Sequence, residues 1–175
     1  MTMPADLADL TKPVRATTWS CRGDALPSSS AVDLISDRPN RWNAEGVPTI
    51  YLSGDPALAL LESGRHPDDL EEHSRLVAVD LDLPRAVDLR DDSVREALGL
   101  PDDRDWILDR DRTRAVAAAI RSSGAADGMV VPSAGALDQP ERWNVVVFAD
   151  DRARVTASLA SPRPGGEVRI AKPRD

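Results

Sequence analysis

Apolar residues along the chain fall into short runs separated by turn-forming residues, and most of the runs have the length of strands. Residues 76–83 alternate between two faces, one of which carries Asp80 and Asp82, as in a half-buried strand that Pro84 then closes. Strands are predicted by these runs over residues 14–22, 48–53, 76–83, 87–89, 127–132, 143–149 and 154–158.

Helical patterns are fewer. Asp55 and Pro56 suit an N-cap and a first helical residue, and Leu58, Leu61 and Glu62 follow at helical spacing. Helices are predicted over residues 57–63, 93–98 and 113–122, and the segment 23–40 is a loop with room for one helical turn. Because strands outnumber helices and do not alternate with them, the predicted fold class is α+β, a largely antiparallel or mixed sheet with a few flanking helices.

The length and composition fit one domain. A chain of 175 residues, 41% of them hydrophobic, can bury a core of its own. We expect an N-terminal arm over residues 1–13 and the domain itself over residues 14–160. Residues 161–175 are charged and rich in proline and glycine, which predicts a flexible C-terminal tail.

Charge and residue content exclude several classes of protein. The net charge of −8 argues against direct binding to nucleic acid. Cys21 is the only cysteine, and His66 and His73 have no evident third ligand, so neither a disulfide nor a metal site is expected. The first residues lack the pattern of a signal peptide and no apolar run is long enough for a membrane span, so we expect a cytoplasmic protein.

Residues 40–46 bring a cation, an indole and two amides together just before a predicted strand. Arg41 offers a planar fork that suits phosphate or carboxylate, and Trp42 offers a face on which a ring can stack. Residue type alone favours the plainer alternative, in which Trp42 caps the core and Arg41 is solvated.

Four further side chains are candidates for chemistry. Tyr51 and Glu62 belong to one strand–turn–helix unit, which can bring both to one cleft, although each also suits an ordinary structural position. Ser133 follows the apolar strand at 127–132, and Asn144 opens the next strand. No G-x-S-x-G motif surrounds Ser133, which argues against a hydrolase nucleophile elbow.

Aspartates and arginines interleave over residues 102–114. Such a run is typical of a solvated surface whose charges pair with one another. We therefore interpret this segment as a self-paired face.

Taken in order, the motifs resemble the RES-domain family, which is named for an Arg, a Glu and a Ser. The chain carries them as RWNAEG at 41–46, TIYLS at 49–53, ALALLE at 57–62, DGMVVPS at 127–133 and NVVVF at 144–148. No one of these motifs is specific, but five in the family's order are hard to explain by chance. Asn40 departs from the family's glycine before Arg-Trp, and Cys21 stands where an aromatic residue is usual.

The resemblance implies the fold of ADP-ribosyltransferase toxins, a bent, split mixed β-sheet with NAD⁺ in its cleft. It implies an enzyme that cleaves the nicotinamide–ribose bond of NAD⁺ as a glycohydrolase or phosphorylase, with no cofactor and with inorganic phosphate as co-substrate in the second case. It also implies the toxin of a bacterial toxin–antitoxin pair, held by an Xre-like helix-turn-helix antitoxin. A protein mono-ADP-ribosyltransferase and a catalytically weakened NAD-binding or interaction module stay as alternatives.

Catalytic roles follow from the resemblance for four residues. Arg41 would hold a phosphate of NAD⁺, and Tyr51 would stack on the nicotinamide ring. Glu62 would bond the ribose hydroxyls and stabilise the oxocarbenium-like charge as nicotinamide leaves. Ser133 would line the pocket near the ribose or the nicotinamide amide.

The resemblance also implies a set of NAD⁺-binding residues around these four. Asn144 would line the same part of the pocket as Ser133, and Trp42 and Asn43 would bind NAD⁺ from the loop at residues 40–46. The family's first-strand arginine is either Arg22 or Arg15, and Arg22 is favoured because its separation from Arg41 is close to the family spacing.

Overall fold

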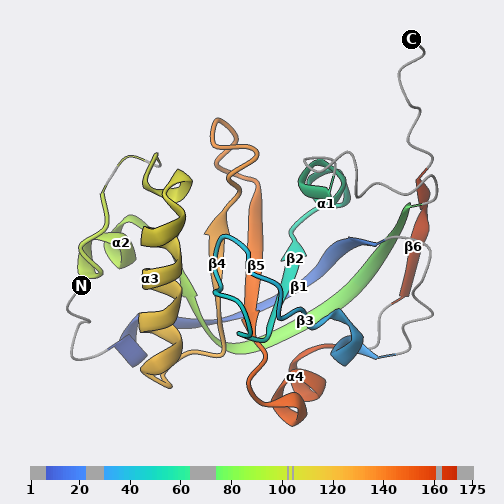
Figure 1. Cartoon of the computed structure of the whole chain (residues 1–175), viewed down its shortest axis with the longest axis horizontal. Coiled ribbons are helices and arrows are strands. Elements are labelled where there is room, and N and C mark those ends of the chain that lie inside the picture. Colours follow the sequence, from blue (N-terminus) through green and yellow to red (C-terminus); the bar gives the residue numbers. More distant parts are fainter. Residues whose placement is uncertain are drawn as a thin grey trace.

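The computed structural model describes residues 7–22, 30–63, 74–101, 103, 105–160 and 163–168. It is an α+β structure in which one strongly curved mixed sheet is flanked by helices, which confirms the predicted fold class (Figure 1). No helix within these ranges has the length and apolar character needed to span a membrane.

Within the described ranges, six strands form one sheet in the spatial order β1–β2–β5–β4–β3–β6. They are β1 (Thr11–Arg22), β2 (Thr49–Ser53), β3 (Ser74–Asp88), β4 (Gly128–Pro132), β5 (Trp143–Phe148) and β6 (Arg163–Val168). The β3–β4 pair is parallel and the other pairs are antiparallel. β1 also pairs with β3, so the sheet closes as a barrel instead of remaining split as the resemblance implies. Closure follows because β1 is long enough to pair with β2 at one edge and with β3 at the other.

β3 passes through a proline that was expected to end it. The register between β1 and β3 shifts between Lys12 and Val14, opposite Pro84 and Arg85 of β3. Such a bulge bends a strand and accommodates a proline that cannot donate a ladder hydrogen bond. The strands predicted over residues 76–83 and 87–89 are therefore one curved strand.

Aspartate side chains begin the helices. At α1, Asp55 accepts a 2.8 Å hydrogen bond from the backbone N of Leu58, as the sequence predicts. Asp91, Asp109 and Asp151 cap the three later α-helices in the same way. The described helices are η1 (Leu7–Leu10), η2 (Ala31–Leu34), α1 (Pro56–Ser63), α2 (Asp92–Ala97), η4 (Asp105–Leu108), α3 (Arg110–Ser122) and α4 (Arg152–Ser158).

α4 occupies the segment 154–158, for which the sequence predicts a strand, and that prediction is wrong. The β-branched residues Val155 and Thr156 favour a strand locally. The cap decides the outcome, because the Asp151 carboxylate accepts hydrogen bonds from the backbone N atoms of Ala153 and Arg154 and starts a helical turn.

Both ends of the chain extend the sheet beyond residues 14–160. β1 begins at Thr11, inside the predicted arm, and Leu7 is 4% exposed in the core. β6 pairs with the start of β3 inside the segment predicted to be a flexible tail. An edge strand has one side that needs no partner, so it tolerates Pro164 and the two glycines that follow.

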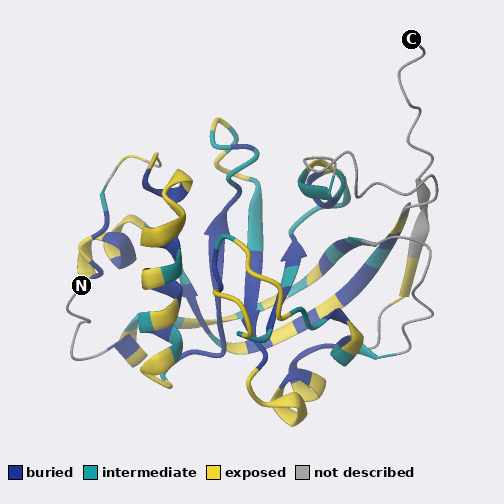
Figure 2. Cartoon of the chain, viewed as in Figure 1, coloured by how far each residue is buried: buried dark blue, intermediate teal, exposed yellow. Residues whose placement is uncertain are grey.

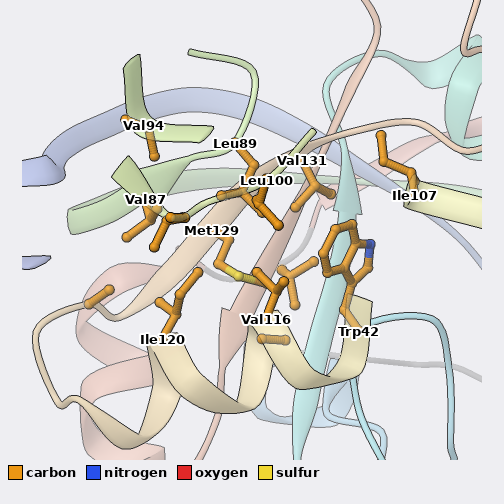
Figure 3. Packing of buried hydrophobic residues seen from close by; sticks show 14 of the residues in the cluster. Trp42, Val87, Leu89, Val94, Leu100, Ile107, Val116, Ile120, Met129 and Val131 are labelled. Atoms are coloured by element: carbon orange, nitrogen blue, oxygen red, sulfur yellow. The ribbon is translucent and has the colours of Figure 1, made fainter. Parts of the chain in front are cut away.

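Buried apolar residues form two clusters, and strands β2, β4 and β5 are buried at the centre of the molecule (Figure 2). In one cluster, Val116 and Ile120 of α3 pack against Met129 of β4 (Figure 3). The other cluster joins the sheet to η2 and α4 through Leu34 and Val155. The first cluster thereby fixes α3 beside β4, which places the first turn of α3 near the end of that strand (Figure 1).

Gly128 begins β4 where this strand passes close to β5. A Cβ added here would lie 2.5 Å from the carbonyl oxygen of Val146, a backbone atom that cannot rotate away. We expect Gly128→Ala to lower the free energy of unfolding by about 1–3 kcal/mol, as measured by urea denaturation. A loss below about 0.5 kcal/mol, the size of an ordinary surface effect, would contradict this close approach.

Candidate active site

A cavity of about 490 Å³ lies between β1, the loop before β2, α1 and the first turn of α3. This volume suits a small-molecule ligand. Polar, aromatic and charged side chains line much of the cavity: Trp19, Cys21, Asn40, Arg41, Trp42, Tyr51, Ser53, Glu62, Arg110 and Asn144.

Glu62 reaches the cavity from the last turn of α1, and two side chains hold its carboxylate. Its Oε1 accepts hydrogen bonds from Ser133 Oγ at 2.5 Å and from Asn144 Nδ2 at 3.2 Å. Asn144 Oδ1 in turn accepts a 2.8 Å hydrogen bond from Ser53 Oγ. This chain of hydrogen bonds fixes the orientation of the carboxylate.

The strand order explains why these partners meet. β5 pairs with both β2 and β4, and Asn144 of β5 faces Ser53 on one side and Val131 on the other. Ser133 follows the last residue of β4 directly. β5 therefore brings Asn144 beside Ser53 of β2, about 90 positions earlier, and beside the end of β4, where Ser133 lies.

Ser133 lies behind the Glu62 carboxylate. It is fully buried and does not line the cavity, whereas its neighbours Pro132 and Ala134 do. Its Oγ donates to Glu62 and accepts a 3.1 Å hydrogen bond from the backbone N of Gly135. The serine is thus placed to hold the carboxylate, whereas the family resemblance placed it at the pocket surface.

Tyr51 lines the cavity, and its hydroxyl is bonded to the loop at residues 40–46. The hydroxyl donates a 2.6 Å hydrogen bond to Asn43 Oδ1 and accepts one of 3.1 Å from the backbone N of Trp42. Burial raises the pKa of Tyr51 above its ordinary value, so the phenol stays neutral at physiological pH. Tyr51 therefore offers the cavity a ring rather than a charge or a base.

Asn43 is 3% exposed and does not line the cavity, although the resemblance placed it among the ligand-binding residues. Its Nδ2 donates to the carbonyl oxygens of Arg38, Ala44 and Val47. The amide is committed to shaping the loop and to receiving the Tyr51 hydroxyl, so it acts on the cavity through Tyr51.

Arg41 and Trp42 differ in how they reach the cavity. Arg41 lines it, and its Nη1 donates a 2.5 Å hydrogen bond to the carbonyl oxygen of Ile107. Trp42 also lines it but is only 4% exposed, because its ring packs edge-on against Trp106 with centroids 5.9 Å apart. The indole therefore belongs mainly to the core, in agreement with the plainer interpretation of this residue (Figure 3).

The two candidates for the family's first-strand arginine, Arg15 and Arg22, lie at different places relative to the cavity. Arg15 is largely exposed, forms an ion pair with Asp82 at 3.1 Å, and does not line the cavity. Arg22 ends β1 next to Cys21, which does line it, but the Arg22 side chain lies outside the described part of the chain. His66 and His73 also lie outside the described residues.

The segment over residues 102–114 does not pair with itself where it is described. No ion pair joins the aspartates and arginines of this segment that the structure describes. Asp109 instead caps α3, and Arg110 lines the cavity. No local pattern predicts this role for Arg110, because a contact between the start of α3 and the loop at 40–46 depends on tertiary packing.

Comparison with known proteins finds a matching family model and a solved structure with a similar fold. The family model of the RES domain matches residues 6–168. No curated protein matches the chain. Among solved structures, the fold is similar to that of a chain in the crystal structure of the M. tuberculosis MbcT–MbcA toxin–antitoxin complex, with 24% identity and a TM-score of 0.66. That similarity covers 88% of this chain and 86% of the other.

Proposed function

Because this chain belongs to the RES-domain family, we propose that it cleaves the nicotinamide–ribose bond of NAD⁺ in the cavity around Glu62. One observation carries the proposal, namely the Glu62 carboxylate held by Ser133 and Asn144 in a cavity that Arg41 and Tyr51 also line. The cavity thus combines a carboxylate, a cation and an aromatic face. NAD⁺ has a matching group for each: the ribose, which becomes positively charged as the bond breaks, for the carboxylate, the pyrophosphate for the cation, and the planar nicotinamide for the aromatic face.

Glu62 acts on the bond that breaks. When the C1′–N bond breaks, its electron pair leaves with nicotinamide, and the ribose develops oxocarbenium-like positive charge. A carboxylate that is already oriented stabilises that charge without reorganising during the reaction. The hydrogen bonds from Ser133 and Asn144 supply this orientation, and the carboxylate also accepts hydrogen bonds from the ribose hydroxyls.

The other lining residues bind the two ends of the substrate. Tyr51 presents its ring to nicotinamide, while its hydroxyl stays bonded to Asn43. The Arg41 fork binds a phosphate. Arg22 and the part of Trp42 that lines the cavity complete the proposed NAD⁺ contacts.

The fragment that remains is taken up by water, by inorganic phosphate or by a protein side chain. The similarity to a chain of a toxin–antitoxin complex supports a role as a toxin whose activity a cognate antitoxin restrains. We place an Xre-like helix-turn-helix protein in the role of that antitoxin.

Product analysis of the purified full chain with NAD⁺ tests the proposal and identifies the acceptor. ADP-ribose as product indicates hydrolysis, and a phosphorylated ADP-ribose formed only with added phosphate indicates phosphorolysis. Transfer of label from NAD⁺ to a protein indicates the mono-ADP-ribosyltransferase alternative. Calorimetric binding of NAD⁺ without any nicotinamide release would reject the enzyme and favour the binding module.

Ser133 is proposed to position Glu62 without touching the substrate. We expect Ser133→Ala to lower kcat about tenfold, because the carboxylate loses a charge-assisted hydrogen bond, and to leave KM within about twofold. Ser122→Ala is the control, because Ser122 is exposed at the end of α3 and does not line the cavity. A rise in KM at unchanged kcat would instead place Ser133 in direct contact with NAD⁺.

A further inference from the structure

Arg110 lines the cavity wall, and its charge has no partner among the residues that the structure describes. In the described part of the chain, the cationic side chains that line the cavity are Arg41 and Arg110, and the carboxylate that lines it is Glu62. Arg110 is exposed at the start of α3, and its guanidinium forms no hydrogen bond or ion pair with the described residues. By contrast, Arg121 at the other end of the helix pairs with Asp150 at 2.9 Å.

Two hydrogen bonds tie the helix that carries Arg110 to the loop that carries Arg41. Thr113 Oγ1 donates to the carbonyl oxygen of Arg41 at 2.7 Å, and Arg114 Nε donates to that of Asn40 at 2.9 Å. In addition, the Arg41 side chain donates a hydrogen bond to the carbonyl oxygen of Ile107, just before the helix. These contacts hold the loop segment of Arg41 against the first turn of α3, and both arginines line the cavity.

In a chain of net charge −8, two arginines in one cavity form a local cationic site suited to an anion. Arginine forks match the oxygens of phosphate groups, and two forks can bind both phosphates of a pyrophosphate. Arg110 begins α3 and Glu62 lies in α1, and these two helices stand on opposite sides of β4, β5 and β2 (Figure 1). An anion held by Arg110 is therefore assigned to the pyrophosphate of the substrate and not to a phosphate that attacks the ribose beside Glu62.

We propose that Arg110 and Arg41 together clamp the pyrophosphate of the dinucleotide, which makes Arg110 a specificity-determining residue. This inference rests on the proposed cleavage of NAD⁺. The clamp selects substrates that carry a pyrophosphate over nicotinamide mononucleotide and nicotinamide riboside.

Calorimetry with ADP-ribose and steady-state kinetics with NAD⁺ test the clamp in the full chain. Arg110→Ala is expected to weaken ADP-ribose binding about tenfold and to raise KM for NAD⁺ by a similar factor, with kcat within about twofold. Inhibition by nicotinamide riboside, which has no phosphate, is expected to be unchanged. Arg112→Ala is the matched control, because it removes the same charge from an exposed position of α3 that does not line the cavity.

Three results would overturn the clamp: unchanged ADP-ribose affinity in Arg110→Ala, an equal loss in Arg112→Ala, or an effect confined to the KM for inorganic phosphate. The last result would identify the anion at Arg110 as a co-substrate. Failure of the proposed function is distinct, since it would appear as a wild-type protein that releases no nicotinamide. In that case, the ADP-ribose affinities of the wild type and of Arg110→Ala, measured by calorimetry, would still test the clamp.

Discussion

Glu62→Gln is expected to slow nicotinamide release from NAD⁺ by about 10³-fold, the effect of losing an oriented group that stabilises transition-state charge. Glutamine has nearly the same shape, so the packing of α1 is retained while the negative charge is removed. Asn144 can still donate to the new side-chain oxygen from its position in β5. KM for NAD⁺ should change far less than kcat, because the lost interaction is strongest in the transition state.

Glu96→Gln is the matched control for this experiment. Glu96 is exposed on α2 and does not line the cavity, so the same chemical change there should leave nicotinamide release unaffected. Thermal unfolding of both variants separates a loss of chemistry from a loss of fold. A Glu62→Gln protein that keeps more than about a tenth of wild-type kcat would show that this carboxylate is not the stabilising group, because removing such a group costs far more.

Trp42→Ala is expected to lower the free energy of unfolding by about 3–5 kcal/mol, the cost of truncating a large buried aromatic side chain. Trp42 is 4% exposed and contacts Trp106 edge-on, and the two rings join the loop at 40–46 to the core around α3. The substitution removes this packing and leaves a cavity in the core beside Trp106. Activity should fall with stability, because the loop that presents Arg41 and supports Tyr51 loses its anchor.

Urea denaturation monitored by circular dichroism measures the effect on stability. Leu108→Ala is the control, since Leu108 is a neighbouring apolar residue but is 54% exposed, and it should change stability by less than about 0.5 kcal/mol. If Trp42→Ala were equally mild, the indole would be a solvent-facing group available for stacking on a ligand, and its assignment to the core would fail.

Local patterns predicted much of the fold. The cap at Asp55, the proline at Pro56 and the apolar spacing that follows were sufficient for α1, and continuous apolar runs were sufficient for β4 and β5. Two differences between the predicted and observed elements have tertiary causes. Pro84 ends a strand by local rules, but a bulge opposite β1 accommodates it. β6 has the composition of a tail, but it gains its order from the edge of β3.

The candidate site was predictable where motifs carry it. The structure brings Glu62, Ser133 and Asn144 into one hydrogen-bonded group, and it adds Ser53, which ends the TIYLS motif but was not among the predicted site residues. Arg110 was missed because an arginine among aspartates has the local pattern of a self-paired surface. Its place depends on hydrogen bonds between α3 and a loop about 70 positions earlier, and no periodicity in the sequence reports such contacts.

NMR of NAD⁺ incubated with the wild-type chain shows directly whether this protein breaks the nicotinamide–ribose bond. We expect one free nicotinamide to appear for each NAD⁺ consumed, while the pyrophosphate of the product stays intact. Unchanged NAD⁺ over the incubation, or its division into AMP and nicotinamide mononucleotide, would show that the protein does not cleave this bond.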